Sequence, residues 1–406
     1  MKKLILASIM ILLMSSLVAH VWAQRPSPTT TIPSKIVFGQ ALSLSGRFAP
    51  NATNLEQLAI ALWLQEVNAK GGIYVKKYNK RLPVELIRYD DKSDVNNMIQ
   101  LVNKLITEDK VDFLLPPHGT DMHFAACPIA NKNGYPLVIW TAASEKLLEG
   151  ASNLPYVFHA ILDYRQRYGD LKDIIEELGV KNIALIYIQG LMGIEISKYL
   201  APAVEAAGVK IVINKSYPIL TPDLSPILKQ IKGENVDALI AISYPSDTLL
   251  ITEQSMVIGL NPKLFFVGIG GAMPIYRDKF GALKLEGVMS EGGWSPRLSP
   301  EAKEYFAKYK SLNGKEPDYF SAPTGYASYQ VYELAIEKAG TLDREKVKEV
   351  MATETFMTVY GPIKFKNQVN IQSPSNIGQW QKGIFEAIGP KKTRTAQPIY
   401  PKPHWP

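Results

Sequence analysis

Alternation of strand-like and helix-like segments is the feature that most limits what this 406-residue chain can fold into. Short apolar runs are separated by segments with helical spacing, such as the one that Asn54 can cap and that stops at Gly71. The expected strands are residues 36–42, 84–89, 111–115, 137–140, 183–188, 209–213, 238–242 and 264–267. Strands that alternate with helices form parallel sheets covered on both faces. These strands are too many for one small sheet, so we predict an α/β fold with two doubly wound lobes.

The first residues have the pattern of a cleaved secretory signal peptide. Residues 1–3, Met-Lys-Lys, form a short basic start, and residues 4–18 are an apolar stretch. The small residues Val21 and Ala23 precede Gln24. An uncleaved membrane anchor is the alternative, but the apolar stretch is shorter than the roughly 20 residues of a spanning helix. We therefore expect an exported protein that is cut near Ala23 and is not membrane-inserted afterwards.

Composition and motifs argue against several classes of function. One cysteine, Cys127, excludes an intrachain disulfide framework and a zinc site made of several thiolates. The formal charge of +7 comes without a run of five like charges, so we expect no nucleic-acid partner. The sequence contains no nucleophile elbow, phosphate loop or HExxH motif, and Met273 stands where the dinucleotide fingerprint after Gly268 needs a glycine. His118 and His123 are poorly spaced for a metal, so we expect no metal, no cofactor and no catalytic residue.

Ligands of open parallel sheets bind beyond the carboxyl ends of the strands, so the loops there are the candidate site. Two of these loops suit an anion, because hydroxyl or small side chains precede a helix N-terminus. One contains Thr120 and Asp121, and the other spans residues 141–144. The alternative is that Thr120 or Ser144 simply caps its helix.

Seven segments, taken together, match a known pattern. Residues 66–73 read Glu-Val-Asn-Ala-Lys-Gly-Gly-Ile, and residues 116–120 read Pro-Pro-His-Gly-Thr. The other segments are residues 36–46, 89–91, 127–130, 243–245 and 361–363. They resemble the leucine/isoleucine/valine-binding proteins, type I periplasmic binding proteins that serve ABC importers, in which Gly-Pro-x-x-Ser is usual at 116–120. The likeness covers nearly the whole mature chain.

The resemblance implies two Rossmann-like lobes joined by a three-crossover hinge. It places residues 34–160 and 290–364 in the N-terminal lobe. Residues 161–289 and 365–390 would form the C-terminal lobe, after which an extended tail would cover 391–406.

The same resemblance implies a ligand held between lobes that close over it. Thr120 and residues 141–144 would hold the ligand carboxylate, and Asp163 and Tyr244 would hold its ammonium. The third ammonium position, usually an acid, falls at Gly270, so we expect a carboxylate whose amino group is absent or weakly recognised. An aromatic or branched acid would suit a pocket near Trp140. The candidate ligand-binding residues are Ser45, Thr120, Asp121, Thr141, Ala142, Ser144, Asp163, Tyr164, Tyr244 and Gly270.

The function that we predict is a periplasmic solute-binding protein of an ABC importer. Its partners would be a small carboxylate-bearing solute, an amino acid or an aromatic or branched organic acid, and the permease subunits. A secreted α/β enzyme and the ligand-binding module of a sensor are the alternatives; no membrane span or signalling domain follows to favour the sensor.

Overall fold

The computed structural model describes residues 32–372 and 377–406. The chain divides into residues 1–34 and the unit Lys35–Pro406, to which every helix and strand below belongs. The predicted signal peptide, residues 1–23, lies outside the described residues.

The first lobe is built on parallel strands. β1 (Ile36–Leu42) lies between β4 (Val84–Asp90) and β5 (Phe113–Leu114), with Ile36 opposite Val84. β6 (Leu137–Ile139) pairs with β7 (Val157–His159), also in parallel. The three remaining strands of that sheet are β13 (Thr355–Thr358), β14 (Gly361–Lys366) and β15 (Val369–Asn370). A separate hairpin consists of β2 (Ile73–Val75) and β3 (Lys80–Leu82).

A tyrosine hydroxyl joins the two sheets of the first lobe. The Tyr332 hydroxyl accepts a hydrogen bond from Val138 N (2.8 Å) and donates one to Leu114 O (2.8 Å). These are backbone groups of β6 and β5, which are not paired directly. The hydroxyl thus satisfies polar groups that would be costly to bury unpaired.

The second lobe contains one seven-stranded sheet in the order β17-β16-β12-β11-β10-β8-β9. Its parallel strands are β8 (Asn182–Ile188), β9 (Lys210–Tyr217), β10 (Ala238–Ile242), β11 (Leu264–Val267) and β12 (Val288–Glu291). β16 (Ile377–Gln381) and β17 (Ile384–Gly389) add an antiparallel edge. All five residues of β10 are buried, as expected for a strand covered on both faces.

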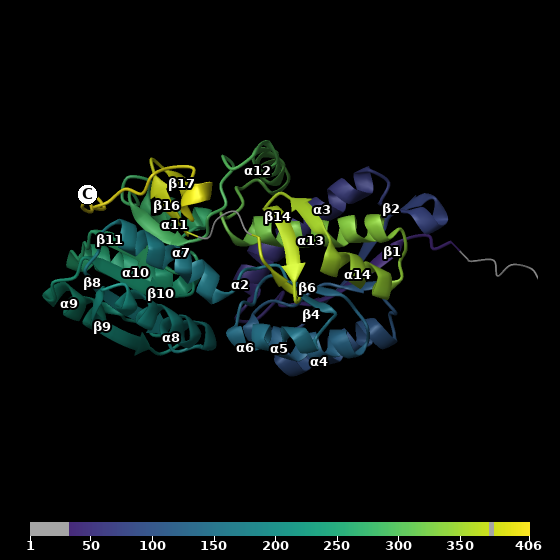
Figure 1. Ribbon diagram of the computed structural model, residues 1–406, viewed down its shortest axis with the longest axis horizontal. Helices are drawn as coiled ribbons and strands as arrows, with labels where there is room; N and C mark the ends of the chain where they lie inside the picture. The colour runs from purple at the N-terminus through teal and green to yellow at the C-terminus, as the bar shows by residue number, and fades with distance from the viewer. Residues whose placement is uncertain (1–31, 373–376) are drawn as a thin grey trace, which may run out of the picture. The chain divides into compact units, whose positions relative to one another are not determined.

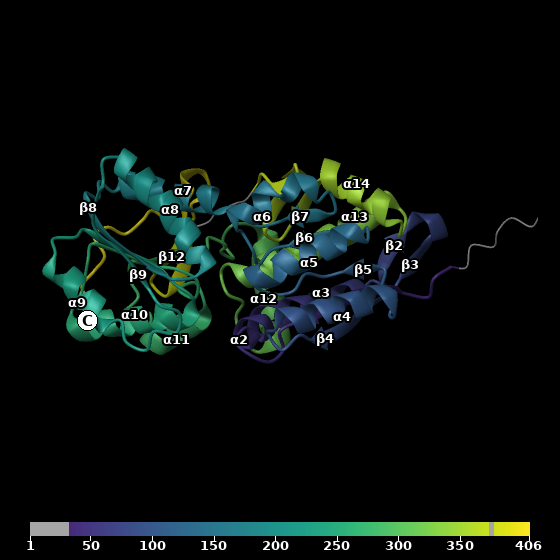
Figure 2. The ribbon, with the colours of Figure 1, turned by 90° about the horizontal axis from the view of Figure 1, so that it is seen from below.

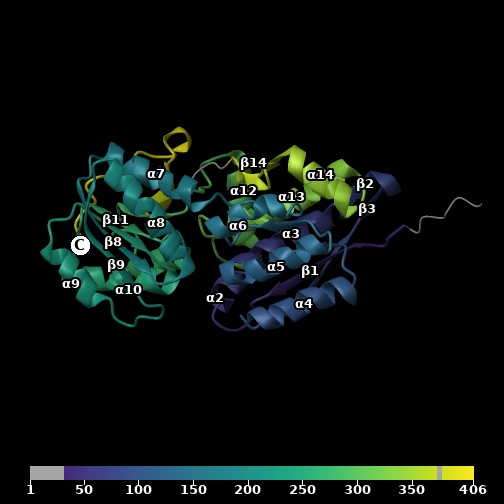
Figure 3. The same cartoon turned by 60° about the horizontal axis from the view of Figure 1, so that its bottom comes forward.

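Helices cover both faces of each lobe. In the first lobe, α3, α13 and α14 lie on one face of the sheets and α4, α5 and α6 on the other (Figure 1). In the second lobe, α7 and α8 lie opposite α9 and α10 (Figures 2 and 3), and α11 lies on the same side as α10 (Figure 2). The first-lobe helices are α2 (Ala49–Asn51), a π-helical turn (Ala52–Glu56), α3 (Gln57–Ala69), α4 (Val95–Thr107), α5 (Thr120–Lys132), α6 (Glu145–Glu149), α12 (Pro300–Asn313), α13 (Ser321–Ala339) and α14 (Arg344–Thr353). The second-lobe helices are α7 (Tyr164–Glu177), α8 (Leu191–Ala206), α9 (Ser225–Gly233), α10 (Pro245–Ile258) and α11 (Pro274–Phe280).

The predicted α/β architecture of two lobes is confirmed, and β1, β10 and β11 begin and end where the sequence predicts. β12, β16 and β17 have no counterpart among the predicted strands. Cys127 is fully buried in the core between α4, α5 and the sheet, where burial raises the pKa of its thiol to about 12.

The predicted lobe boundaries stay a prediction, but strand pairing shows to which sheet the strands near each boundary belong. β12, which ends at Glu291, belongs to the second-lobe sheet, whereas β15 at 369–370 pairs with β7 of the first lobe. In the predicted tail, Lys391–Thr393 form a 3-10 turn, and Lys402 N donates to Lys263 O (2.7 Å).

Candidate functional site

Two first-lobe loops that carry candidate residues are joined by a hydrogen bond. Gly119 N donates to the Thr141 hydroxyl (3.2 Å), which links the loop after β5 to the loop after β6. Gly119 has a φ of +93°, a conformation that favours glycine, and Thr120 follows as the first residue of α5. The hypothesis that Thr120 caps α5 is therefore wrong, because Gly119 holds that position and leaves the Thr120 side chain part-exposed.

The start of α6 is bound to two helices of the second lobe. The Ser144 hydroxyl donates to Glu195 Oε1 (2.9 Å), and Glu145 N donates to Glu195 Oε2 (3.3 Å). Arg165 Nε and Nη2 donate to the two Glu145 carboxylate oxygens at 2.7 and 3.2 Å. We call this set of four residues the interlobe clasp. Ser144 stands at the N-cap position of α6, but its hydroxyl contacts a second-lobe carboxylate instead of an α6 backbone N–H.

Two candidate residues of the second lobe are tyrosines. Tyr164, the first residue of α7, is 4% exposed; burial, together with the nearby Tyr244, raises the pKa of its hydroxyl. Burial and the negative charge of Asp121 raise the pKa of Tyr244 to about 12. Asp121 is on first-lobe α5 and Tyr244 precedes α10 of the second lobe, so these two candidate residues are near enough for the charge of one to act on the other.

The buried ion pair of Arg167 and Glu291 packs against Tyr164. The Arg167 guanidinium lies 5.5 Å from the Tyr164 ring and 4.9 Å from the ring of Phe320, and it contacts the Glu291 carboxylate. Tyr168 adds a hydrogen bond to Glu291 (3.2 Å). This packing fixes the position of α7 at the point where β12 ends.

Three other candidate residues make local polar contacts, and a fourth is buried. Asp163 caps α7 by accepting from Gln166 N (2.7 Å), and Asp121 pairs with Arg47 (3.3 Å). The Ser45 hydroxyl donates to Asp90 Oδ2 (2.7 Å), and no described contact joins it to Thr120 or Thr141. Ala142 is buried. These positions remain predictions as ligand contacts.

Position 270 has no room for a side chain. Gly270 has a φ of +104°, and a Cβ there would lie 2.7 Å from Pro245 Cα. The acid that the resemblance would place here is thus excluded by the backbone itself. Trp140 is buried, and its ring packs against α13, where a Cβ on Gly325 would approach it to 2.7 Å. The expected pocket near Trp140 stays a prediction.

Sequence reasoning missed the residues that hold these loops from other elements. Glu195 and Arg165 lie near the starts of their helices, and nothing in the local sequence marks them. His118 was considered only as a metal ligand; its Nδ1 instead contacts the buried carboxylate of Glu56. Within the described residues, no cluster of His, Cys, Asp and Glu could hold a metal ion.

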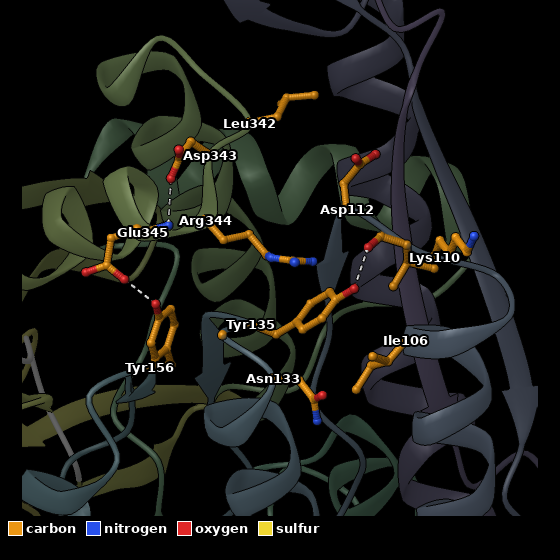
Figure 4. A pocket seen from close by; sticks show the side chains of 12 residues that line it. Ile106, Lys110, Asp112, Asn133, Tyr135, Tyr156, Leu342, Asp343, Arg344 and Glu345 are labelled. Carbon is orange, nitrogen blue, oxygen red and sulfur yellow. Dashed lines mark hydrogen bonds between the residues drawn. The ribbon is translucent and has the colours of Figure 1, made fainter.

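A pocket of about 710 Å³ lies elsewhere on the first lobe (Figure 4). Its walls come from segments that precede β5, β6 and α14, including Asp112, Tyr135 and Arg344. The Arg344 guanidinium stacks 3.7 Å from the Tyr135 ring centroid. Because these segments enter their strands, the pocket is at the opposite sheet edge from Thr120 and Thr141, and none of the candidate residues lines it.

A sequence model of the periplasmic binding protein family matches residues 35–383, which is most of the chain. The chain belongs to the periplasmic binding protein family. Its members are solute-binding proteins, periplasmic or extracellular, and not enzymes, which confirms the predicted class of function. Within residues 32–372 and 377–406, the structure has no helix of the length and apolar character needed to cross a membrane.

Three similar proteins place this periplasmic binding protein among its relatives. Leu/Ile/Val-binding protein homolog 7 of Brucella suis is 25% identical over 345 residues, which cover 80% of this chain and 84% of that protein. The structure of the branched-chain amino acid transporter substrate-binding protein LivJ of Streptococcus pneumoniae, in complex with isoleucine, has a TM-score of 0.76 and 22% identity, with 87% of this chain and 98% of that chain covered. An ABC transporter solute-binding protein of Rhodopseudomonas palustris, in complex with 3,4-dihydroxybenzoic acid, has a TM-score of 0.73 and 21% identity and covers 92% and 99%. These structures confirm the type I periplasmic binding protein fold.

The steric exclusion at position 270 can be tested by stability. We expect Gly270→Ala to lower the free energy of unfolding by about 1–3 kcal/mol more than Gly281→Ala does, because the new Cβ overpacks against Pro245. Gly281 is the matched control, since its φ is +81° and a Cβ there would have nothing within 4 Å. Urea unfolding of both variants gives the comparison. Equal losses would show that position 270 can accept a side chain.

Proposed function

We propose that this protein is the solute-binding component of an ABC importer and that it captures a small carboxylate between its two lobes. The observation that carries the proposal is the hydrogen bond from Gly119 N to the Thr141 hydroxyl, which joins the two first-lobe loops beside Thr120. Asp121, the next residue of α5, acts through its charge on Tyr244 of the other lobe. Both similar structures described above come from ABC transporter proteins that bind a carboxylate-bearing solute. The permease subunits would be its partners, and the periplasm its location after cleavage near Ala23.

Each residue of the proposed site has a role. Thr120 offers its hydroxyl to the ligand carboxylate at the first turn of α5, where backbone N–H groups favour an anion. The Thr141 hydroxyl accepts from Gly119 N and donates to Pro117 O (3.4 Å), and it would turn to the carboxylate when the ligand binds. Tyr164 and Tyr244 offer ring faces and hydroxyls from the second lobe. The interlobe clasp closes one side of the region, since Ser144 and Glu145 are bonded across it.

The acids near the site favour a ligand without an ammonium group. A buried ammonium needs an anionic or hydrogen-bonding partner. Asp121 pairs with Arg47, Asp163 caps α7, and Glu195 is bonded to Ser144, so each of these carboxylates already has a partner. Position 270 cannot supply another carboxylate, because a side chain there would collide with Pro245. We infer that the preferred solute is a branched or aromatic organic acid rather than an α-amino acid.

Calorimetry with matched pairs tests the proposed ligand class. The pairs are leucine with 4-methylpentanoate, and phenylalanine with 3-phenylpropanoate, which differ only by the amino group. We expect the deaminated member of at least one pair to bind at least as tightly as its amino acid. An amino acid that binds at least tenfold more tightly than its partner would show that an ammonium site exists after all.

The role of Thr120 is tested by Thr120→Val, which keeps the shape of the side chain and removes the hydroxyl. A hydrogen bond to a charged group contributes about 1.5–3 kcal/mol, so we expect the affinity for the best acid of that panel to fall at least tenfold. Thr353→Val, at an exposed position at the end of α14, is the control and should bind as the wild type does. A loss of less than threefold in Thr120→Val would remove Thr120 from the site.

A further inference from the structure

The first-lobe pocket of Figure 4 is formed by segments that lie far apart in the sequence. Its wall residues lie mainly in residues 106–112, which lead from α4 into β5, in 133–135, which lead into β6, and in 342–345 at the start of α14. Its volume of about 710 Å³ is within the usual range of small-ligand sites. The solute site proposed above uses none of these residues.

The guanidinium of Arg344 is held in this pocket by an aromatic ring. It lies 3.7 Å from the centroid of the Tyr135 ring. Tyr135 is itself fixed, because it is 4% exposed and its hydroxyl donates to Val111 O (3.0 Å). Within residues 32–372 and 377–406, the Arg344 side chain makes no hydrogen bond or ion pair. Stacking therefore orients a guanidinium whose N–H groups remain available.

Asp112 lines the same pocket from the segment before β5 (Figure 4). Its Oδ2 accepts from Val37 N (2.7 Å), and its Oδ1 makes no hydrogen bond to any described residue. Burial raises the pKa of Asp112, whereas the hydrogen bond from Val37 N and the charge of Arg344 act in the opposite direction. Asp112 and Arg344 are thus near enough for their charges to interact, but they form no direct ion pair.

The other charged residues that line the pocket are bonded elsewhere or point away from it. Asp343 caps α14 by accepting from two backbone N–H groups. The Glu345 carboxylate contacts the Tyr156 hydroxyl and Lys348. The Lys110 side chain extends away from the guanidinium (Figure 4). One cation and one carboxylate are therefore left facing the pocket without a full set of partners.

We propose that this pocket is a second, peripheral binding site for a small zwitterion, an α-amino acid whose carboxylate pairs with Arg344 and whose ammonium pairs with Asp112. A guanidinium can donate to both oxygens of one carboxylate, and an ammonium has three N–H donors. A simple anion would be repelled by Asp112, and a simple cation by Arg344. A zwitterion instead replaces one interaction at a distance by two direct ion pairs. The inference does not rest on the proposed function, because the pocket is at the opposite sheet edge from Thr120.

Apolar side chains beside the two charges favour an amino acid with an aliphatic side chain. Ile106 and Leu342 both line the pocket, and both are half-buried. The exposed part of each is apolar surface that a ligand side chain would remove from water. Leucine is therefore the probe that fits the charges and the walls together.

Three matched probes test whether both charges are used. They are leucine, 4-methylpentanoate, which lacks the ammonium, and isopentylamine, which lacks the carboxylate. In protein with ¹⁵N-labelled arginine, the Nε–H signal of Arg344 is assigned from its loss in Arg344→Gln and reports binding at this pocket. We expect leucine to shift that signal saturably, and each of the other probes to bind there at least tenfold more weakly, or by about 1.4 kcal/mol. No shift with leucine, or equal binding of 4-methylpentanoate, would overturn the inference.

Asp112→Asn tests the ammonium partner. It keeps an oxygen for Val37 N and removes the negative charge, so the leucine affinity read from the Arg344 signal should fall at least tenfold. Lys346→Gln, at an exposed position outside the pocket, is the control and should bind as the wild type does. Urea unfolding shows whether each variant is folded, and the three probes on the wild type decide the matter if Asp112→Asn is not. An unchanged affinity in folded Asp112→Asn would contradict the pairing.

Thr120→Val separates the pocket from the proposed solute site. Leucine should shift the Arg344 signal equally in this variant and in the wild type, since Thr120 does not line the pocket. A shift that disappears in Thr120→Val would come from the solute site, and the inference would fail while the proposed function stands. If leucine shifts the Arg344 signal but no organic acid binds the protein, the proposed ligand class fails and the inference stands.

Discussion

Parallel strand pairing is the constraint on which the rest of this structure depends. It places the ends of β10 and β11 at the same edge of the second-lobe sheet, so the loops after them must pass very close to one another. A Cβ on Gly268 would lie 2.6 Å from the Ser243 backbone, and one on Gly270 would lie 2.7 Å from Pro245. The same pairing therefore places Tyr244 at the carboxyl edge of the second-lobe sheet and leaves no room for an acidic side chain at position 270.

In the first lobe, the same edge is held together by side chains as well as by strands. Tyr332 bridges β5 and β6, and Thr141 accepts from Gly119 in the loop that follows β5. Each of these bonds satisfies a backbone group at a point where the strands themselves do not pair. The result is that the first turn of α5 and the loop after β6 are held against each other at the carboxyl ends of the strands.

The parts of this structure that follow from local pattern could be predicted from the sequence. β10 is an uninterrupted apolar run between polar segments, so its bounds were predicted correctly. Thr120 was selected because it follows a strand and precedes a helix, and its role in binding stays a prediction. β12 and β16 were missed because they contain Glu291 and Gln379, whose burial depends on Arg167 and on backbone carbonyls such as Gly287 O (3.0 Å). Glu195 and Glu56 were missed for the same reason: their partners, Ser144 and His118, are 51 and 62 residues away. Contacts between side chains this far apart in the sequence cannot be predicted from the spacing of residues within one segment.

The central claim is that the two lobes close over a solute, because contacts from both lobes are complete only in the closed form. Small-angle X-ray scattering of the protein, with and without a saturating acid ligand identified by calorimetry, tests it most directly. The account predicts a smaller radius of gyration in the presence of the ligand. An unchanged radius, with binding confirmed in the same sample, would contradict capture by lobe closure.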